Sequence, residues 1–146
     1  MGKFWGAVVL LVLSLVAVSW GRKQETLEEL IARADAAKPD HQSKLYLDVA
    51  EREMDALMES YKKNDWNNFR SELQQVVNYC GKAHTAAIQS DKKLKGTEIK
   101  IREISGKLRD LKLNVDFDDE AVVQTAINQL EGFRTDLLQK MFGPKQ

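Results

Sequence analysis

The sequence predicts an all-α protein, a helical bundle built on one long central helix with helical hairpins packed at each end. Apolar residues recur at spacings of three and four along most of the chain beyond residue 26, as they do in helices that bury one face. No segment alternates apolar and polar residues over the length of a strand. The two prolines, Pro39 and Pro144, stand where helices are expected to end.

The first 21 residues have the composition of a targeting segment. Residues 4–18 contain no charge, and small residues suitable for cleavage follow between residues 17 and 21. We expect residues 1–21 to be a cleaved secretory signal peptide, or an N-terminal membrane anchor whose residues 4–20 just reach the length of a bilayer span. A buried core helix is the remaining alternative. The first two make the protein exported, periplasmic or secreted, or else membrane-anchored.

The remaining residues, 22–146, are expected to form a single helical-bundle domain. The whole chain has 22 basic and 22 acidic residues, and without residues 1–21 it has 21 basic and 22 acidic ones, a net charge of −1. This balance argues against a dedicated nucleic-acid binder, because such proteins usually carry a strong basic excess. With Cys80 as its one cysteine, the chain has no internal disulfide framework, so its stability must come from packing.

The first helix is expected over residues 27–37. Thr26 and Glu29 fit a capping box, in which each side chain bonds to the backbone of the other residue. Pro39 is expected to stop this helix. A second amphipathic helix is expected over residues 43–62.

Asp40 or Ser43 is expected to cap the helix over residues 43–62. The segment 61–66, with the sequence Tyr-Lys-Lys-Asn-Asp-Trp, resembles the turn between the two helices of a tetratricopeptide-like repeat. In this chain Phe69 stands where that family commonly has a small residue, and there is no second copy. The resemblance implies an interaction scaffold.

The longest predicted helix runs over residues 66–113, with Asp65 as its cap. Steps of three and four keep one heptad phase along this whole stretch, which two helices joined by a loop have no reason to share. A break near residues 90–96, where the apolar series becomes small and polar, is the alternative. The helices at 27–37 and 43–62 should pack on its first half. The predicted buried positions are Trp66, Phe69, Leu73, Val76, Cys80, Ala83, Ala87, Ser90, Leu94, Thr97, Ile101, Ile104, Leu108, Leu111 and Val115.

A final helix is expected over residues 119–142, after a turn at residues 114–118. Asp116 or Asp118 can cap it, and the acidic residues of its first turn suit the positive end of the helix dipole. Gly143 and the proline after it should end the helix. We expect this helix to fold back on the second half of the long one.

Cys80 and His84 are the pair most suggestive of chemistry. They are four residues apart, so they share a helix face and could bind a metal, but a closed site needs about four ligands. Cys80 also lies on the predicted core seam, so it is either a buried free thiol or a reactive, intermolecular one. Methionines on apolar faces (Met54, Met58 and Met141) suggest core filling rather than a haem site. No catalytic or cofactor motif is present, and neither an enzyme nor a cofactor is expected.

Charge is unevenly distributed over the second half of the chain. Residues 91–113 carry eight basic side chains against four acidic ones, and residues 116–131 carry five acidic side chains and no basic one. In one interpretation the basic stretch faces the acidic helix start. In the other it contacts an anionic partner such as a phospholipid surface or a cell-wall polymer. The candidate contact residues are Lys92, Lys93, Lys95, Lys100 and Arg102.

These observations predict an exported, non-enzymatic protein that acts as a protein-interaction or structural module of the cell envelope. A protein partner or self-association is expected, and nucleic acid is not. Contact with a membrane is expected only through the N-terminal segment, if it stays uncleaved. The alternatives are a carrier of a small ligand or metal within the bundle, and a binder of an anionic lipid surface at the envelope.

Overall fold

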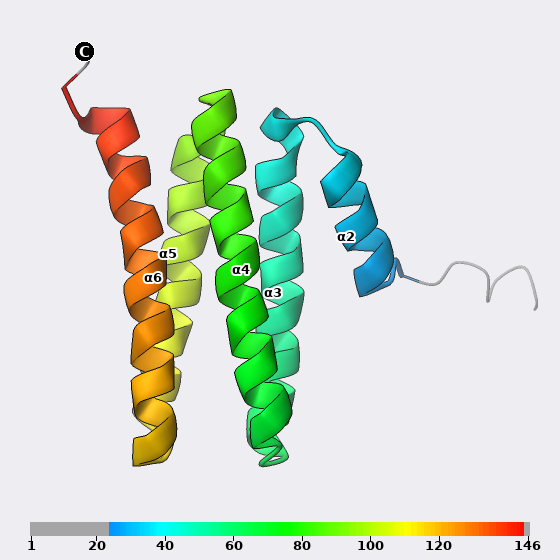
Figure 1. Ribbon diagram of the computed structural model, residues 1–146, viewed down its shortest axis with the longest axis vertical. Coiled ribbons are helices and arrows are strands. Elements are labelled where there is room, and N and C mark those ends of the chain that lie inside the picture. Colours follow the sequence, from blue (N-terminus) through cyan, green and yellow to red (C-terminus); the bar gives the residue numbers. More distant parts are fainter. Residues whose placement is uncertain (1–23, 145–146) are drawn as a thin grey trace, which may run out of the picture.

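The computed structural model describes residues 24–144, in which it shows five helices and no strand, and this confirms the predicted all-α bundle. The helices are α2 (Leu27–Ala36), α3 (Pro39–Lys62), α4 (Trp66–Ser90), α5 (Leu94–Lys112) and α6 (Phe117–Phe142) (Figure 1). The predicted signal peptide or anchor, residues 1–21, lies outside the described range. None of the described helices combines the length and apolar character that a membrane-crossing helix needs.

The four long helices form two antiparallel hairpins, α3–α4 and α5–α6, which pack side by side (Figure 1). Between the hairpins, α4 and α6 run in the same direction. Arg70 and His84 of α4 therefore meet Asp119 and Asp136 of α6 in the same order along both helices. The helices α3 and α5 also run in one direction, while the short α2 packs against α3.

Two of the predicted helix caps are confirmed. The Thr26 hydroxyl accepts a hydrogen bond from the Glu29 backbone N–H at 3.2 Å. The Asp65 carboxylate accepts one from the Asn68 backbone N–H at 3.3 Å, so α4 begins where its cap predicts. Asp116 occupies the cap position of α6, although its side chain makes no capping hydrogen bond.

The predicted start of the second helix is wrong. Pro39 was expected to stop the first helix, with Asp40 or Ser43 capping the next, but α3 begins at Pro39 itself, after the cap residue Lys38. Proline suits the first helical position because its fixed φ is already helical and the N–H that it lacks has no partner there. The same residue therefore separates α2 from α3 and starts α3.

The predicted continuous helix over residues 66–113 is also wrong, and the alternative of a break near residues 90–96 is correct. Asp91 and Lys93 adopt left-handed conformations, with φ of 54° and 62°, and reverse the chain between α4 and α5. The heptad phase survives the reversal because both helices turn the same series of side chains toward one core. Phase alone therefore does not distinguish a straight helix from a folded one.

The core lies between the two hairpins and contains most side chains of the predicted heptad series. At one point the hairpins approach closely, because a Cβ added to Gly81 would lie 3.0 Å from the Phe133 ring. A glycine inside α4 thus serves the contact with α6. The buried seam residues of α4 and α5 are Phe69, Leu73, Val76, Cys80, Ala83, Ala87, Thr97, Ile101, Ile104, Leu108 and Leu111.

One carboxyl group is buried at the α3–α4 interface without an ion pair to another described residue. Glu53 is 8% exposed, and burial together with the nearby charge of Glu72 raises the pKa of its carboxyl above the ordinary value. Because the folded state binds this proton more tightly than the unfolded state, its contribution to stability is full at low pH. That contribution is lost as pH rises through the folded-state pKa of Glu53.

We expect Glu53→Gln to raise the free energy of unfolding at about pH 7, because the neutral amide avoids a buried charge. The gain should shrink toward pH 4.5, the ordinary carboxyl value, where the native Glu53 is protonated. Urea unfolding at both pH values measures this difference. Asp55→Asn, a change at an exposed position in the interior of α3, is the control and should show neither effect. A Glu53→Gln variant that is less stable than wild type at neutral pH would contradict the expectation.

Candidate functional site

A groove lies between the beginning of α5 and the end of α6, and we refer to it as the α5–α6 groove. Its volume is about 660 Å³. The turn that follows α4 borders it, so three parts of the chain meet there. The residues that line the groove are Asp91, Leu94, Lys95, Glu98, Ile99, Arg102, Leu138, Lys140, Met141 and Phe142.

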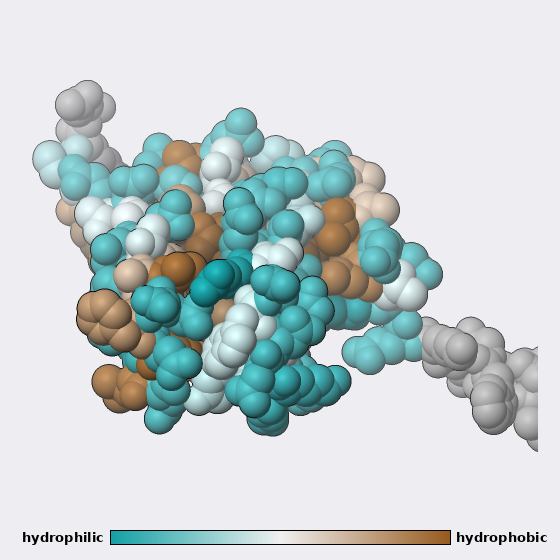
Figure 2. All heavy atoms as spheres, turned by 60° about the horizontal axis from the view of Figure 1, so that its bottom comes forward, coloured by the Kyte–Doolittle hydropathy of each residue, from teal (hydrophilic) through white to brown (hydrophobic). Residues whose placement is uncertain are grey.

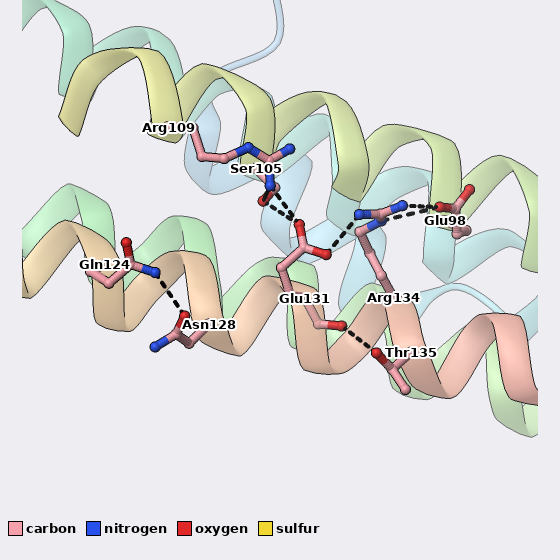
Figure 3. A network of polar contacts seen from close by, with 8 residues as sticks. All are labelled: Glu98, Ser105, Arg109, Gln124, Asn128, Glu131, Arg134 and Thr135. Atoms are coloured by element: carbon pink, nitrogen blue, oxygen red, sulfur yellow. Dashed lines mark hydrogen bonds and ion pairs between the residues drawn. The ribbon is translucent and has the colours of Figure 1, made fainter. Parts of the chain in front are cut away.

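A polar network holds α5 and α6 together beside this groove and reaches the groove at Glu98 (Figure 3). Glu98, with a side chain 7% exposed, accepts hydrogen bonds from Nε and Nη2 of Arg134 at 3.1 and 2.9 Å. The third guanidinium nitrogen, Nη1, donates to Glu131 at 2.7 Å. Both of the bonds to Glu98 end on the same oxygen, Oε1, and together with the bond to Glu131 they fix the register of α6 against α5.

The network continues away from the groove through Glu131. Its carboxylate accepts hydrogen bonds from the Ser105 hydroxyl at 2.8 Å and from Arg109 at 2.9 Å (Figure 3). Burial raises the pKa of Glu131, but these hydrogen bonds and the Arg134 charge outweigh it and hold the pKa below its ordinary value. The carboxylate therefore stays ionised and paired through the neutral range.

The structure divides the predicted anionic-contact residues into two groups. Lys100, whose side chain is 37% exposed, pairs with Glu51 at 2.8 Å and Glu103 at 3.3 Å, and its hydrogen bond with Glu51 raises the pKa of its ammonium group. Arg102 lies at the groove, 3.8 Å from Glu98. These contacts leave Lys100 poorly placed to bind a partner.

The other three predicted residues, Lys92, Lys93 and Lys95, are exposed and make no ion pair with another described residue. Lys140 of α6 shares this property, and Lys95 and Lys140 both line the α5–α6 groove. The pairing interpretation thus fits the later part of the basic stretch, where Arg109 pairs with an α6 carboxylate. We define Lys95 and Lys140 as the basic rim of the groove. Lys92 and Lys93 do not line it, and Lys93 lines a separate pocket between α3 and α5.

Apolar side chains of α6 reach the surface beside the basic rim. Phe142 is 79% exposed and Leu138 is 38% exposed, and Met141 lies between them along the helix. The spacing of three and four residues from Leu130 through Leu137 predicts that Leu138 and Met141 belong to the buried stripe of the last helix. Nothing in the sequence indicates that Lys140 would join the rim. The register of α6 against α5 determines both the exposure of these apolar side chains and the position of Lys140. The Glu98–Arg134 pair fixes this register, and its two residues are 36 positions apart in the sequence.

Other exposed apolar residues lie at the opposite end of the bundle. Figure 2 shows apolar side chains at one edge of that end, and Leu113 and Phe117 at the α5–α6 turn are largely exposed. Their chain neighbours include Asp116 and Asp118, which are exposed acidic residues. The α5–α6 turn therefore carries exposed carboxylates beside its exposed apolar side chains.

Cys80 is fully buried, and burial raises the pKa of its thiol to about 12. The thiol is therefore free and protonated, without the thiolate character of a reactive cysteine. His84 stacks on Phe133, with ring centroids 5.1 Å apart, and its Nε2 lies 3.2 Å from Asp136. Among residues 24–144 no group of three or more His, Cys, Asp or Glu side chains is placed to hold a metal ion.

A further groove of about 610 Å³ runs over α4 between α3 and α6. Several of its polar side chains are engaged within the chain. The Tyr46 hydroxyl donates to Asp35 at 2.7 Å, and Lys82 lies over the Tyr46 and Tyr79 rings at 5.5 and 5.2 Å from their centroids. The α5–α6 groove differs because its basic rim has no such partners in the described part of the chain.

Comparisons with protein-family models, with curated proteins and with solved structures gave no match. The resemblance of the 61–66 turn to a tetratricopeptide-like hairpin therefore stays a prediction from sequence. The site is therefore described by its geometry alone. It is a groove between two helices with apolar side chains in its lining, a polar network that holds the helices together and a basic rim. Such a surface suits the binding of an amphipathic, negatively charged ligand.

Proposed function

We propose that this protein is a non-catalytic binding module whose α5–α6 groove takes an acidic amphipathic helix of a partner protein. The observation that carries the proposal is the exposure of Phe142 and Leu138 within a groove that unpaired lysines border. Large exposed apolar side chains beside a polar rim are typical of interaction sites.

The shape of the groove favours a helix as the occupant. Two packed helices create a trough along their contact, and an amphipathic helix lays its apolar face into such a trough. Leu94, Ile99 and Leu138 would meet that apolar face. The lysines of the basic rim would meet carboxylates on its flanks, which speeds association and selects acidic partners over basic ones.

The composition of the N-terminal segment supports a partner outside the cytoplasm. Residues 1–21 have the composition of a signal peptide or anchor, so the partner would be a protein of the cell envelope or a secreted one. If residues 4–20 remain in the membrane, the bundle is tethered at the membrane surface. If they are removed, the bundle diffuses with its groove available.

Two helical peptides of about 15 residues test the proposal, because this is near the length at which isolated helices become marginally stable. Both carry leucine on one face, and the other face carries glutamate in one peptide and lysine in the other. We expect fluorescence anisotropy to show binding of the acidic peptide and at least about tenfold weaker binding of the basic one. Lys95→Glu/Lys140→Glu should reverse this preference.

Lys62→Glu/Lys63→Glu makes the same charge change at the opposite end of the bundle and should leave binding as in wild type. Equal binding of both peptides, or equal loss in both variants, would contradict the proposal. Vesicles with and without anionic lipid complete the test. Binding of wild type to anionic vesicles, with no binding of the acidic peptide, would assign the basic rim to a lipid surface instead.

A further inference from the structure

The turn between α4 and α5 holds two residues in the left-handed backbone conformation. Asp91 and Lys93 have φ of 54° and 62°, and of these two residue types aspartate tolerates this region whereas lysine seldom occupies it, so the strain lies mainly at Lys93. Both residues are exposed, and no side chain caps the first turn of α5. Continuing α4 through these residues would relieve the positive φ values and give the backbone groups at both helix ends their helical partners.

The core positions of α4 and α5 would remain on one face of such a continuous helix. Steps of seven from Leu73 and Cys80 lead through Ala87 to Leu94 and Ile101, which are buried or partly buried in the folded turn as well. Seven-residue steps keep side chains on the same face of a packed helix. In a straight helix the core side chains of α4 and α5 would thus form one continuous apolar face. In the folded turn they form two separate faces, one on each helix.

The α3–α4 turn lacks this property, although Asn64 there also has a positive φ of 56°. Steps of seven from the buried Ala50 and Leu57 lead to Asn64 and Ser71, which are both exposed. Straightening this turn would put the two buried faces on different sides of one helix. The sequence pattern therefore marks residues 91–93 as a hinge that can open without loss of the core face.

The contacts that hold the two hairpins together are well suited to exchange between copies. They include the ion pairs Arg70–Asp119 and Lys100–Glu51, both at 2.8 Å, and the contact of Phe133 with Gly81. The Glu98–Arg134 network lies within one hairpin and would move with it. A second copy of the chain can offer every one of the contacts between hairpins with the same geometry.

We propose that the partner that fits this core face is a second copy of the chain, which exchanges α5–α6 hairpins through a straightened hinge at residues 91–93. In the exchanged dimer, α4 and α5 form one helix, and each α5–α6 hairpin packs on the α3–α4 hairpin of the other copy. Short hinges under backbone strain favour such exchange. The dimer would keep the α5 and α6 side chains that line each groove, whereas Asp91, which borders the groove from the turn, would become part of the straight helix. Formation of the dimer does not depend on what binds in the grooves.

Two hinge variants test the exchange in the full chain after refolding at high protein concentration. Asp91→Ala/Lys93→Ala favours a helical hinge, whereas Asp91→Gly/Lys93→Gly accommodates the positive φ values of the turn. Light scattering should show more dimer than wild type for the alanine variant and less for the glycine variant. Asn64→Ala is the control in the out-of-phase turn and should match wild type.

A zero-length carbodiimide cross-link then identifies the exchange. In a dimer refolded from mixed ¹⁴N and ¹⁵N chains, the Glu51–Lys100 cross-link should join chains of different label. The Lys112–Glu120 pair, 3.9 Å apart within one hairpin, should join chains of the same label only. A dimer whose Glu51–Lys100 cross-links all lie within one chain would overturn the proposal, as would monomers in every variant or equal dimer fractions in the two hinge variants.

Discussion

Replacing Phe69 with alanine is expected to lower the free energy of unfolding by about 3–5 kcal/mol. Phe69 is 0% exposed, so the change removes a full aromatic ring from the core. The ring also contacts Trp66 and Tyr61, with centroids 5.6 and 6.4 Å apart. These neighbours belong to the α3–α4 turn, where a rigid reversal limits how far the structure can collapse into the cavity.

Urea unfolding followed by far-UV circular dichroism measures the loss at Phe69. The matched control is Phe142→Ala, which removes the same ring from a largely exposed position at the end of α6. We expect this control to keep its stability within about 0.5 kcal/mol of wild type and to weaken binding of the acidic peptide. Equal destabilisation by the two changes would show that Phe142 packs in a core and not at an open groove.

The second large effect is expected at Arg134. Arg134→Met should lower the free energy of unfolding by about 3 kcal/mol, because it removes the hydrogen-bonded partner of the buried Glu98 carboxylate and leaves only Arg102, 3.8 Å away. The methionine keeps most of the apolar stem, so the lost charge and not the lost volume causes the effect. Urea unfolding at neutral pH measures it. Thermal unfolding should show the same order of stabilities.

The double change Glu98→Met/Arg134→Met is the control, since it removes both charges together. Replacing a complete buried ion pair with apolar side chains is often neutral or stabilising, so the double variant should recover most of the loss. A double variant as unstable as Arg134→Met would show that packing, and not the unpaired charge, accounts for the effect.

The sequence predicts the buried side chains better than it predicts the path of the backbone. Phe69, Ile101 and most of the long apolar series are buried in the core as expected. The members that are only partly buried are Trp66, Ser90, Leu94 and Val115. The predicted path of the backbone is wrong at Asp91 and Lys93, because the heptad phase indicates only which side chains share a core face. A straight helix and a folded hairpin satisfy the same pattern when both present that face to one core.

The candidate site shows the same limit. The exposed lysines Lys92, Lys93 and Lys95 could be predicted from local charge, since they lie together in one short segment. Their apolar neighbours on α6 could not, because the meeting of the two segments depends on helix register. Local charge predicted Lys100 as a contact residue as well, but it pairs with Glu51, which lies on a helix far away in the sequence.

The division of the core into two hairpins also bears on how the chain reaches its fold. Within each hairpin the packed helices are neighbours in sequence, so these contacts close short loops and can form early. The contacts of α4 with α6 and of α3 with α5 join distant segments and follow later. Changes at the Arg70–Asp119 pair should therefore accelerate unfolding and leave the rate of folding almost unaltered.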